Sequence, residues 1–167
     1  MKLFKQAGEY SIEIWLDPET GCTVREFWRN QQNEFEAPDD RPAMAFFCPK
    51  TRIREQARWM KAGELHRAND LPSQIITSPV TGIVCVRQWS IDGNGHRDGD
   101  NPSYEVTNLF TGNREELHFE KWGKFHRIGA GAVQYFDPQT GKLTKEDFWE
   151  NGVQLPKKSG APKPSMT

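Results

Sequence analysis

A period of thirty residues constrains the fold of this chain more than any other feature of its sequence. Each copy carries an aromatic residue, a glycine, a His-Arg pair and a proline in fixed register. The copies stand at Trp59, Gly63, His66, Arg67 and Pro72; at Trp89, Gly93, His96, Arg97 and Pro102; and at Phe119, Gly123, His126 and Arg127, with Ala132 at the proline position. A further step of thirty reaches Trp149. A fixed period of this length predicts an array of stacked structural units.

Two degraded copies flank the regular ones. Upstream, Trp28 leads to Pro42 with one residue inserted, and Phe35 and Glu36 stand where His-Arg is expected. Downstream, Trp149 begins a copy that ends soon after Gly152. Stacked arrays need atypical terminal units as caps, so both degraded copies fit such an array.

A turn signal precedes each aromatic position by seven or eight residues. Its copies read Asp17-Pro-Glu-Thr-Gly21, Ser78-Pro-Val-Thr-Gly82, Asn108-Leu-Phe-Thr-Gly112 and Asp137-Pro-Gln-Thr-Gly141, with Cys48-Pro49-Lys-Thr51 as the weakest version. Proline in second place favours a type I turn, and the closing glycine suits the left-handed conformation of a bulged hairpin. Each unit is therefore predicted to be a β-hairpin.

The predicted strands lie on either side of these turns. First strands are expected over 10–16, 43–47, 73–77, 103–108 and 133–136, and second strands over 22–28, 52–59, 83–89, 113–119 and 142–149. One segment disagrees, because Arg52 to Ala62 is rich in helix formers with Ile53, Ala57 and Met60 at helical spacing. The repeat register overrules the helix, since the equivalent segment around Val84 is β-prone.

We therefore predict an all-β protein whose tandem hairpin repeats form an elongated antiparallel meander or an open, curled sheet. About five hairpins occupy residues 1–153 as one domain, and the polar, proline-rich segment 154–167 is expected to be a disordered tail. One aromatic per unit should form a ladder that supplies much of the apolar burial. The ladder residues are Trp28, Trp59, Trp89, Phe119 and Trp149.

Charge and cysteine content narrow the class of partner and the compartment. Twenty-two basic and twenty-three acidic residues give a formal net charge of −1, so no overall field attracts nucleic acid or anionic membranes, and any charge-driven binding must be local. Cys22, Cys48 and Cys85 are odd in number and widely spaced, which favours buried, reduced thiols. With no signal-peptide-like start, these features predict a cytoplasmic protein.

The repeated His-Arg pairs have a structural and a functional interpretation. Equivalent histidines in a regular stack are separated by about 9 to 10 Å per unit, so they cannot share one metal ion. His66, His96 and His126 are expected to bond to backbone in the loops between hairpins, where Gly63, Gly93 and Gly123 make the turns. The arginines either pair with nearby acids such as Asp70, Asp98 or Asp100, or form a row along one edge that can bind carboxylate or phosphate.

Sequence motifs for catalysis are absent from the chain. It has no glycine-rich phosphate loop, GxSxG, HExxH or CxxC pattern. We therefore expect that the chain is not an enzyme and that it binds no metal and no cofactor.

The unit W-x-x-x-G-x-x-H-R-x-x-x-x-P, followed by a strand, a turn and a strand, resembles the MORN-like variant repeats of bacterial proteins, including the YwqK-family antitoxins. The resemblance covers about residues 10 to 152. It implies a β-hairpin repeat fold and a role as a toxin-neutralising partner or a scaffold. This chain departs from ordinary MORN repeats in its His-Arg pairs and DP-x-TG turns.

The first functional hypothesis is a non-enzymatic module that binds a protein partner, such as a toxin or effector blocked by an antitoxin or immunity protein. Its candidate contact residues are Arg67, Arg97, Arg127, Trp122, Phe125 and Trp15. The alternatives are a small phosphodiesterase or nuclease that uses the His-Arg pairs, and a phospholipid- or polyphosphate-binding scaffold. Nucleic acid and membrane are the less favoured partners, and the oligomeric state stays open.

Overall fold

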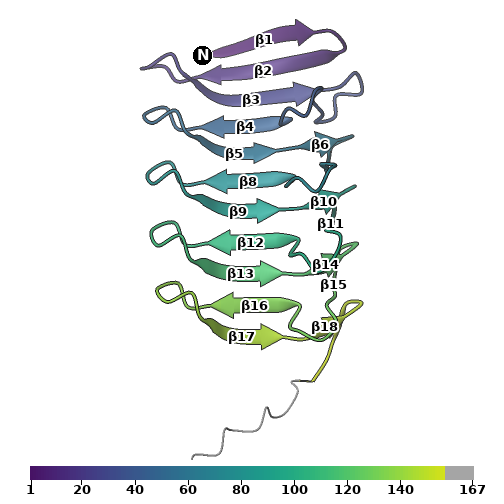
Figure 1. Ribbon diagram of the computed structural model, residues 1–167. Helices are drawn as coiled ribbons and strands as arrows, with labels where there is room; N and C mark the ends of the chain where they lie inside the picture. The colour runs from purple at the N-terminus through teal and green to yellow at the C-terminus, as the bar shows by residue number, and fades with distance from the viewer. Residues whose placement is uncertain (157–167) are drawn as a thin grey trace, which may run out of the picture.

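The computed structural model describes residues 1–156, and this part of the chain is all-β, without a helix. Eleven antiparallel strands form one open sheet in the order β1-β2-β3-β4-β5-β8-β9-β12-β13-β16-β17. The strands follow one another as a meander along the long axis of the molecule, from β1 at the top of Figure 1 to β17 near the bottom. The predicted elongated hairpin array is confirmed, and its sheet is open rather than closed into a barrel.

The strands of the main sheet are short. Their bounds are β1 Lys2–Ala7, β2 Tyr10–Leu16, β3 Thr23–Arg29, β4 Met44–Phe47, β5 Arg54–Arg58, β8 Gln74–Thr77, β9 Val84–Gln88, β12 Tyr104–Thr107, β13 Arg114–His118, β16 Val133–Phe136 and β17 Leu143–Asp147. We divide the described chain into five units after the N-terminal strand. They are unit 1 (10–42), unit 2 (43–72), unit 3 (73–102), unit 4 (103–131) and unit 5 (132–156).

The hairpin turns form as the sequence predicts. In unit 1, Asp17 Oδ1 accepts hydrogen bonds from the backbone N–H of Glu19 and Thr20, and Gly21 has a φ of 68°. Each of the five hairpins has a register shift at the same place, next to the turn. In the weakest copy Arg52 takes the left-handed position at φ 61°, where the other four turns have glycine. These irregularities are the β-bulges that the closing residue was expected to make.

The segment with helical propensity is a strand. Ala57 in β5 pairs with Ala45 on one side and with Ile75 on the other. Both alanines are buried, so tertiary pairing overrides the local preference for helix.

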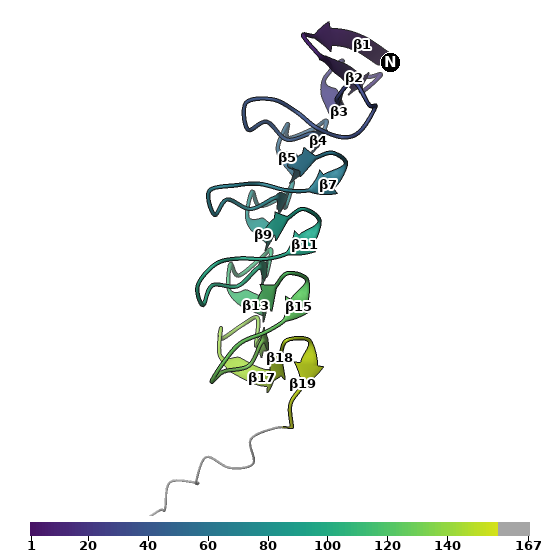
Figure 2. The same cartoon turned by 90° about the vertical axis from the view of Figure 1, so that its right-hand side faces the viewer.

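A second, smaller series of hairpins was not predicted. Two-residue strands pair at the end of each of units 2 to 5, as β6 Met60–Lys61 with β7 Glu64–Leu65, β10 Ser90–Ile91 with β11 Asn94–Gly95, β14 Glu120–Lys121 with β15 Lys124–Phe125, and β18 Trp149–Glu150 with β19 Val153–Gln154. Seen from the side, they form a column of their own beside the edge of the main sheet (Figure 2). We call this column the small-hairpin edge.

The turns of the small hairpins each consist of two residues with positive φ. The pairs are Ala62-Gly63, Asp92-Gly93, Trp122-Gly123 and Asn151-Gly152. Two successive residues in this conformation define a type I′ turn, which explains the repeated glycine. Each of these glycines also donates its N–H to a carbonyl of the preceding unit, as Gly93 does to Leu65 at 3.0 Å. Backbone hydrogen bonds thus join successive small hairpins to one another, and each small hairpin continues the chain of the main sheet.

The N-terminal strand β1 was also missed. It pairs along its whole length with β2, from Lys2 with Trp15 to Ala7 with Tyr10. It therefore adds an edge strand that lies outside the repeat.

The aromatic ladder forms, with one correction. Trp28, Trp59, Trp89 and Phe119 are all buried, with exposed fractions of 5–6%. The backbone N–H of each ladder aromatic donates to the backbone carbonyl of a small, fully buried residue that opens the next unit. The four pairs are Trp28 with Ala43, Trp59 with Ser73, Trp89 with Ser103 and Phe119 with Ala132. The core is this thin seam between units.

Trp149 does not occupy the ladder position of the last unit, so that prediction was wrong. His126 donates its N–H to the carbonyl of Phe119, and the equivalent bond in unit 5 runs from Leu155 to Phe148. Phe148 is therefore the ladder residue, and Trp149 lies one position further on, packed against Phe125.

The slip of register arises in the loop that ends unit 4. Ala132 accepts the N–H of Phe119 as Ser103 accepts that of Trp89, so Ala132 is equivalent to Ser103. It does not stand at the proline position, as the sequence suggested; Gly131 does. Unit 4 is one residue shorter than units 2 and 3.

The remaining sequence predictions concern the thiols and the tail. Cys22, Cys48 and Cys85 are unpaired, and all three are half-buried rather than fully buried. Gln154 pairs with Trp149 in the last small hairpin, and residues 157–167 of the predicted tail lie outside the described residues. Within residues 1–156 there is no helix long and apolar enough to span a membrane.

The ladder predicts that replacing a buried ladder aromatic destabilises the protein much more than replacing an exposed aromatic. Trp89→Ala should lower the free energy of unfolding by about 3–5 kcal/mol, because it removes a buried ring from the seam between units 3 and 4. Phe110→Ala is the matched control: its side chain is 76% exposed on a turn, and the expected change is within about 0.5 kcal/mol. Urea unfolding followed by circular dichroism measures both, and equal effects would contradict the ladder.

Candidate functional site

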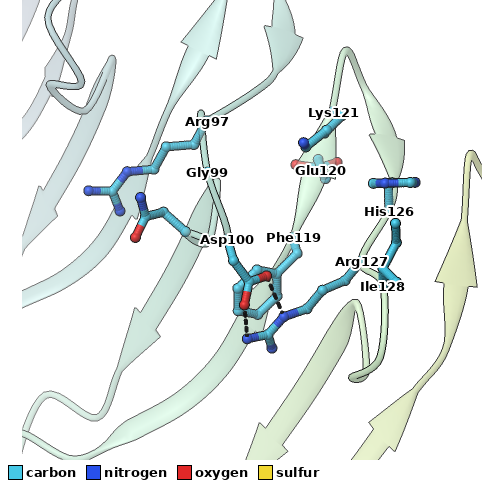
Figure 3. Close-up of a pocket in the computed structure, with 10 residues that line it drawn as sticks. Arg97, Gly99, Asp100, Phe119, Glu120, Lys121, His126, Arg127 and Ile128 are labelled. Carbon is cyan, nitrogen blue, oxygen red and sulfur yellow. Dashed lines mark hydrogen bonds and ion pairs between the residues drawn. The ribbon is translucent and has the colours of Figure 1, made fainter.

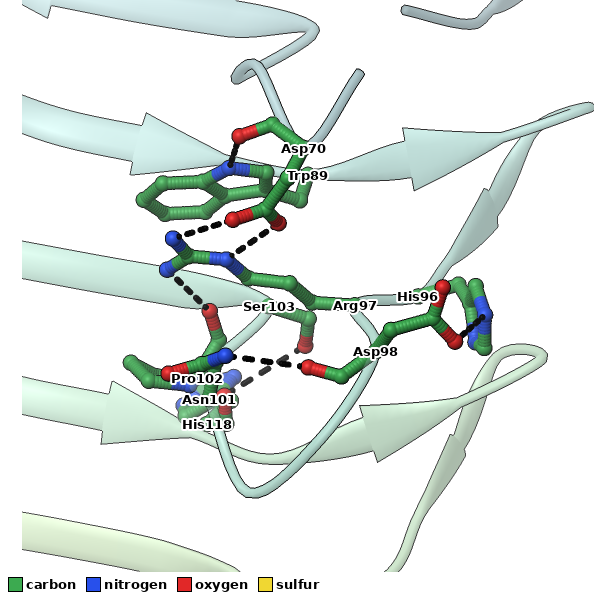
Figure 4. A network of polar contacts seen from close by, with 9 residues as sticks. All are labelled: Asp70, Trp89, His96, Arg97, Asp98, Asn101, Pro102, Ser103 and His118. Carbon is green, nitrogen blue, oxygen red and sulfur yellow. Dashed lines mark hydrogen bonds and ion pairs between the residues drawn. The ribbon is translucent and has the colours of Figure 1, made fainter. Parts of the chain in front are cut away.

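The three arginines of the His-Arg pairs form one repeated contact between units. Arg97 in unit 3 donates from Nε to Oδ1 of Asp70 at 2.7 Å and from the adjacent nitrogen to Oδ2 at 3.0 Å. Its remaining terminal nitrogen donates to the carbonyl of Pro102 at 3.3 Å (Figure 4). Asp70 belongs to unit 2, so one guanidinium joins two units. We call this arrangement the arginine bracket.

The bracket occurs three times with the same atoms. Arg67 binds Asp40 and Arg127 binds Asp100 through the same two-point contact, at distances of 2.7–2.8 Å. In all three copies the aspartate lies twenty-seven residues before the arginine. A planar guanidinium suits this geometry because its paired N–H groups match the two oxygens of a carboxylate.

Each bracket arginine also covers a ladder aromatic. The guanidinium carbon lies 3.7 Å from the ring centroid of Trp59 in unit 2, 3.9 Å from Trp89 in unit 3 and 3.6 Å from Phe119 in unit 4. The indole N–H of Trp89 donates to the backbone carbonyl of Asp70, so the ladder ring and the arginine hold the same residue. The cation–π contact thus couples the ladder to the ion pair.

The bracket sets the ionisation of its aspartates. Hydrogen bonding from Arg97 lowers the pKa of Asp70, and Arg67 and Arg127 do the same for Asp40 and Asp100. The arginine side chains are only 14–17% exposed, whereas the aspartates are 53–68% exposed. The predicted row of arginines along one edge is present, but the guanidinium N–H groups bind aspartates of the same chain.

The brackets stop at both ends of the array. In unit 4, Ala130 follows Gly129 where Asp100 follows Gly99, and in unit 5 Pro156 follows Leu155 where Arg127 follows His126. Between units 4 and 5, alanine therefore stands at the aspartate position and proline at the arginine position, so no fourth bracket forms there. At the other end, Glu36 donates its N–H to the carbonyl of Trp28 as His66 does to that of Trp59. Glu36 and Ala37, and not Phe35 and Glu36 as the sequence suggested, therefore stand at the His-Arg positions of unit 1. The terminal units are the caps that the degraded copies predict.

The histidines contact the next unit rather than their own loop. Nδ1 of His66 lies 2.8 Å from Oδ1 of Asp92, whereas Nδ1 of His126 accepts the backbone N–H of Asn151 at 3.2 Å. The expected bond to backbone is therefore present at His126, and at His66 a contact with a carboxylate takes its place. Each contact crosses between neighbouring small hairpins and therefore joins two units.

His96 departs from this pattern. Its Nδ1 is buried and has no hydrogen-bond partner within the described chain, and its Nε2 lies 3.4 Å from Asp98. The indole of Trp122 stacks on its ring, with centroids 4.1 Å apart and an interplanar angle of 16°.

Trp122 is the most unusual of the predicted contact residues. It has a φ of 53° in the turn between β14 and β15, and its side chain is 58% exposed. A bulky residue in the left-handed region is rare and costs of order 1–3 kcal/mol. The sequence singled out this residue for lying off the ladder, but gave no signal of its backbone conformation or of its contact with His96.

The other predicted contact residues lie elsewhere. Phe125 is half-buried, between His118 and Trp149. Trp15 lies on β2, at the opposite end of the array from Trp122, and donates its indole N–H to Glu13. The structure therefore does not bring the six predicted residues into one surface.

A shallow groove of about 370 Å³ lies beside the last bracket. Its walls come from the loop that ends unit 3 and from the small hairpin of unit 4 (Figure 3). Lys121, His126 and Arg127 line it together with Glu120. Glu120 accepts a hydrogen bond from Ser103, and Arg127 is held by Asp100. A similar groove of about 300 Å³ contains Lys61, His66 and Arg67 in unit 2.

The histidines and acids of the array do not converge. Across residues 1–156, no group of three or more His, Cys, Asp or Glu side chains is placed to hold a metal ion. In each His-Arg pair the arginine binds an aspartate of the preceding unit, and His66 and His126 contact the following unit.

Comparison of the chain with protein-family models, with curated proteins and with solved structures finds no match. The resemblance to MORN-like repeats therefore stays a prediction from the repeat motif.

The bracket predicts that the effects of mutating its aspartate and its arginine on the free energy of unfolding are not additive, although the two residues are twenty-seven positions apart. In a double-mutant cycle with Asp70→Asn and Arg97→Gln, the coupling should be about 0.5–1 kcal/mol, because the aspartate is half exposed and its charge is screened. Arg97→Gln alone should cost more than Asp70→Asn, since it also removes the contacts with Trp89 and Pro102. Additive effects in chemical unfolding would show that the ion pair contributes nothing.

The lowered aspartate pKa values predict a loss of stability in acid. The brackets contribute fully above the usual carboxyl pKa of about 4, and the contribution disappears as the pH falls through the lower folded-state values. Thermal unfolding between pH 2 and pH 7 should show the wild type losing its advantage over an Asp40→Asn, Asp70→Asn, Asp100→Asn variant at acid pH. Parallel curves over the whole range would refute this linkage.

Proposed function

We propose that this chain is a non-enzymatic protein-binding module whose small-hairpin edge, centred on Trp122, contacts a partner protein. The observation that carries the proposal is the conformation of Trp122. A solvent-exposed tryptophan stands at a position where asparagine or glycine avoids strain, and exposed aromatic side chains are frequent anchors of protein interfaces.

The surroundings of Trp122 support an interface role. His96 supports one face of its indole, which reduces the freedom that the side chain loses on binding. Exposed Ile128 adds apolar surface on the loop that follows the same small hairpin, and Lys121 and Lys124 flank the turn. The rigid stack of units behind this edge presents these groups without a folding cost at the moment of binding.

The partner class follows from the resemblance to YwqK-family repeats. We propose a toxin or effector that is neutralised by the bound array, as an antitoxin or immunity protein does. The alternative of a phosphodiesterase or nuclease requires free His-Arg pairs, whereas Arg67, Arg97 and Arg127 are each bound to an aspartate. The alternative of a polyphosphate- or phospholipid-binding scaffold would rest on Lys121 and His126 in the groove of unit 4.

Trp122→Asn tests the proposal without destabilising the fold. Asparagine already stands at the equivalent turn position, Asn151, so the substitution should leave the melting temperature unchanged or raise it slightly. We expect the variant to lose at least tenfold in affinity for the protein that co-purifies stoichiometrically with the wild type. Isothermal titration calorimetry with that protein provides the measurement.

Asp92→Asn is the matched control, because it changes the same turn position in the neighbouring unit. It should bind like the wild type. If Trp122→Asn also binds like the wild type, Trp122 is not the anchor and the proposal is wrong.

A further inference from the structure

The N-terminal part of the sheet carries a regular pattern of rings and charges that the proposed function does not use. Each of the first four strands places one aromatic residue on the same face, namely Phe4 on β1, Trp15 on β2, Phe27 on β3 and Phe46 on β4. We call this the aromatic face. Trp28, which follows Phe27, points to the opposite face, so the ladder and the aromatic face lie on different sides of the sheet.

Two rows of directly paired residues give the pattern. One row reads Lys2, Trp15, Arg25, Phe46 and Gln56, and the neighbouring row reads Phe4, Glu13, Phe27, Met44 and Arg58. Paired residues share a face and lie about 5 Å apart. Along the first row, from β1 to β4, a cation and an aromatic ring alternate. In the second row the aromatic rings lie on β1 and β3, beside the cations of the first row.

The rings and cations touch one another. The Lys2 ammonium lies 4.7 Å from the centroid of Phe4 and 5.0 Å from that of Trp15, and the Arg25 guanidinium carbon lies 5.7 Å from Trp15 on its other side. Phe4 is 70% exposed and Trp15 36% exposed. The Lys2 ammonium also forms an ion pair with Glu13 at 3.0 Å. A phosphate that binds Lys2 would replace this carboxylate and the ring contacts together, which leaves the ring faces free.

The charge of the aromatic face is locally positive. Lys2, Arg25 and Arg58 face a single acid, Glu13, across the two rows. Further along the same rows, β13 to β17 supply Glu116 and Asp147 beside Lys145, so the excess of positive charge is confined to the N-terminal strands. A chain with a net charge of −1 thus concentrates positive charge where it also exposes aromatic rings.

We propose that the aromatic face binds single-stranded nucleic acid, with bases stacking on Phe4 and Trp15 and phosphates contacting Lys2 and Arg25. Exposed aromatics interleaved with cations on an open surface are the two components of sequence-tolerant binding to single strands. A duplex keeps its bases stacked internally, so it can use only the charges of this face. The proposed site is therefore selective for unpaired strands.

Fluorescence anisotropy with labelled dT12 and with a 12-base-pair duplex, at 50 mM salt, tests the site. We expect tighter binding of dT12 than of the duplex. Phe4→Ala and Trp15→Ala should each weaken dT12 binding by roughly tenfold, the loss of about one stacked base. Arg25→Gln should reduce the slope of log K against log salt by about 0.7, the contribution of one phosphate contact.

The same sheet face supplies the control. Lys145 lies 4.9 Å from the ring of Tyr135, in the same row but at the other end of the array, so Tyr135→Ala removes a similar cation–aromatic pair outside the proposed site. It should leave dT12 binding unchanged, as should Trp122→Asn. Circular dichroism confirms that each variant is folded.

Three results would overturn the proposal. They are the absence of dT12 binding at 50 mM salt, equal affinity for the duplex, and displacement of dT12 by polyglutamate with no dependence on Phe4 or Trp15, which would identify a surface for acidic protein segments. Because Trp122→Asn leaves this face intact, failure here and failure of the small-hairpin edge are separate outcomes.

Discussion

The arginine bracket is the side-chain contact that joins each of units 2 to 4 to the unit before it, in addition to the pairing of strands between units. A single sheet without a second layer cannot build a deep core, so each unit has to be fastened to the unit before it. Arg67, Arg97 and Arg127 do this by stacking on a ladder aromatic of their own unit while binding an aspartate of the preceding one. The ion pair alone is half exposed and weak, but the ring beneath it keeps the guanidinium in place.

The residues that support the fold are different from the residues that we propose to bind partners. The repeated residues that first suggest a binding site are occupied within the fold, whereas the residues that break the repeat are free to face solvent. Trp122 replaces the small or polar residues found at the equivalent turns, and Phe4 and Trp15 lie at the end of the array where the bracket is absent. A stack held by nearest-neighbour contacts tolerates such local departures, because a change in one unit affects only the units beside it.

Much of the fold could be predicted from the sequence because its signals repeat. Five turn motifs in one register identified five hairpins, and the register correctly rejected a helix around Ala57. The small hairpins were missed because their strands have only two residues, too short for any alternation to show. The slip that places Phe148 rather than Trp149 in the ladder arises because unit 4 is one residue shorter before Ala132, and the aromatic Trp149, thirty residues after Phe119, concealed it. The partner of each arginine was harder still to predict: Asp98 is next to Arg97 in sequence, whereas Asp70 lies twenty-seven residues before it, and only the stacking of units brings Asp70 to Arg97.

Deletion of unit 3, residues 73–102, tests the central claim most directly. Removing one whole unit joins Pro72 to Ser103 and brings Asp70 opposite Arg127 in place of Asp100, so the strand pairing and the arginine bracket between neighbouring units can form again. The shortened protein should unfold cooperatively, retain its β-sheet circular dichroism, and be shorter by about 10 Å in small-angle X-ray scattering. An unfolded or aggregated product, beside a wild type that folds normally, would contradict a stack built only from contacts between neighbours.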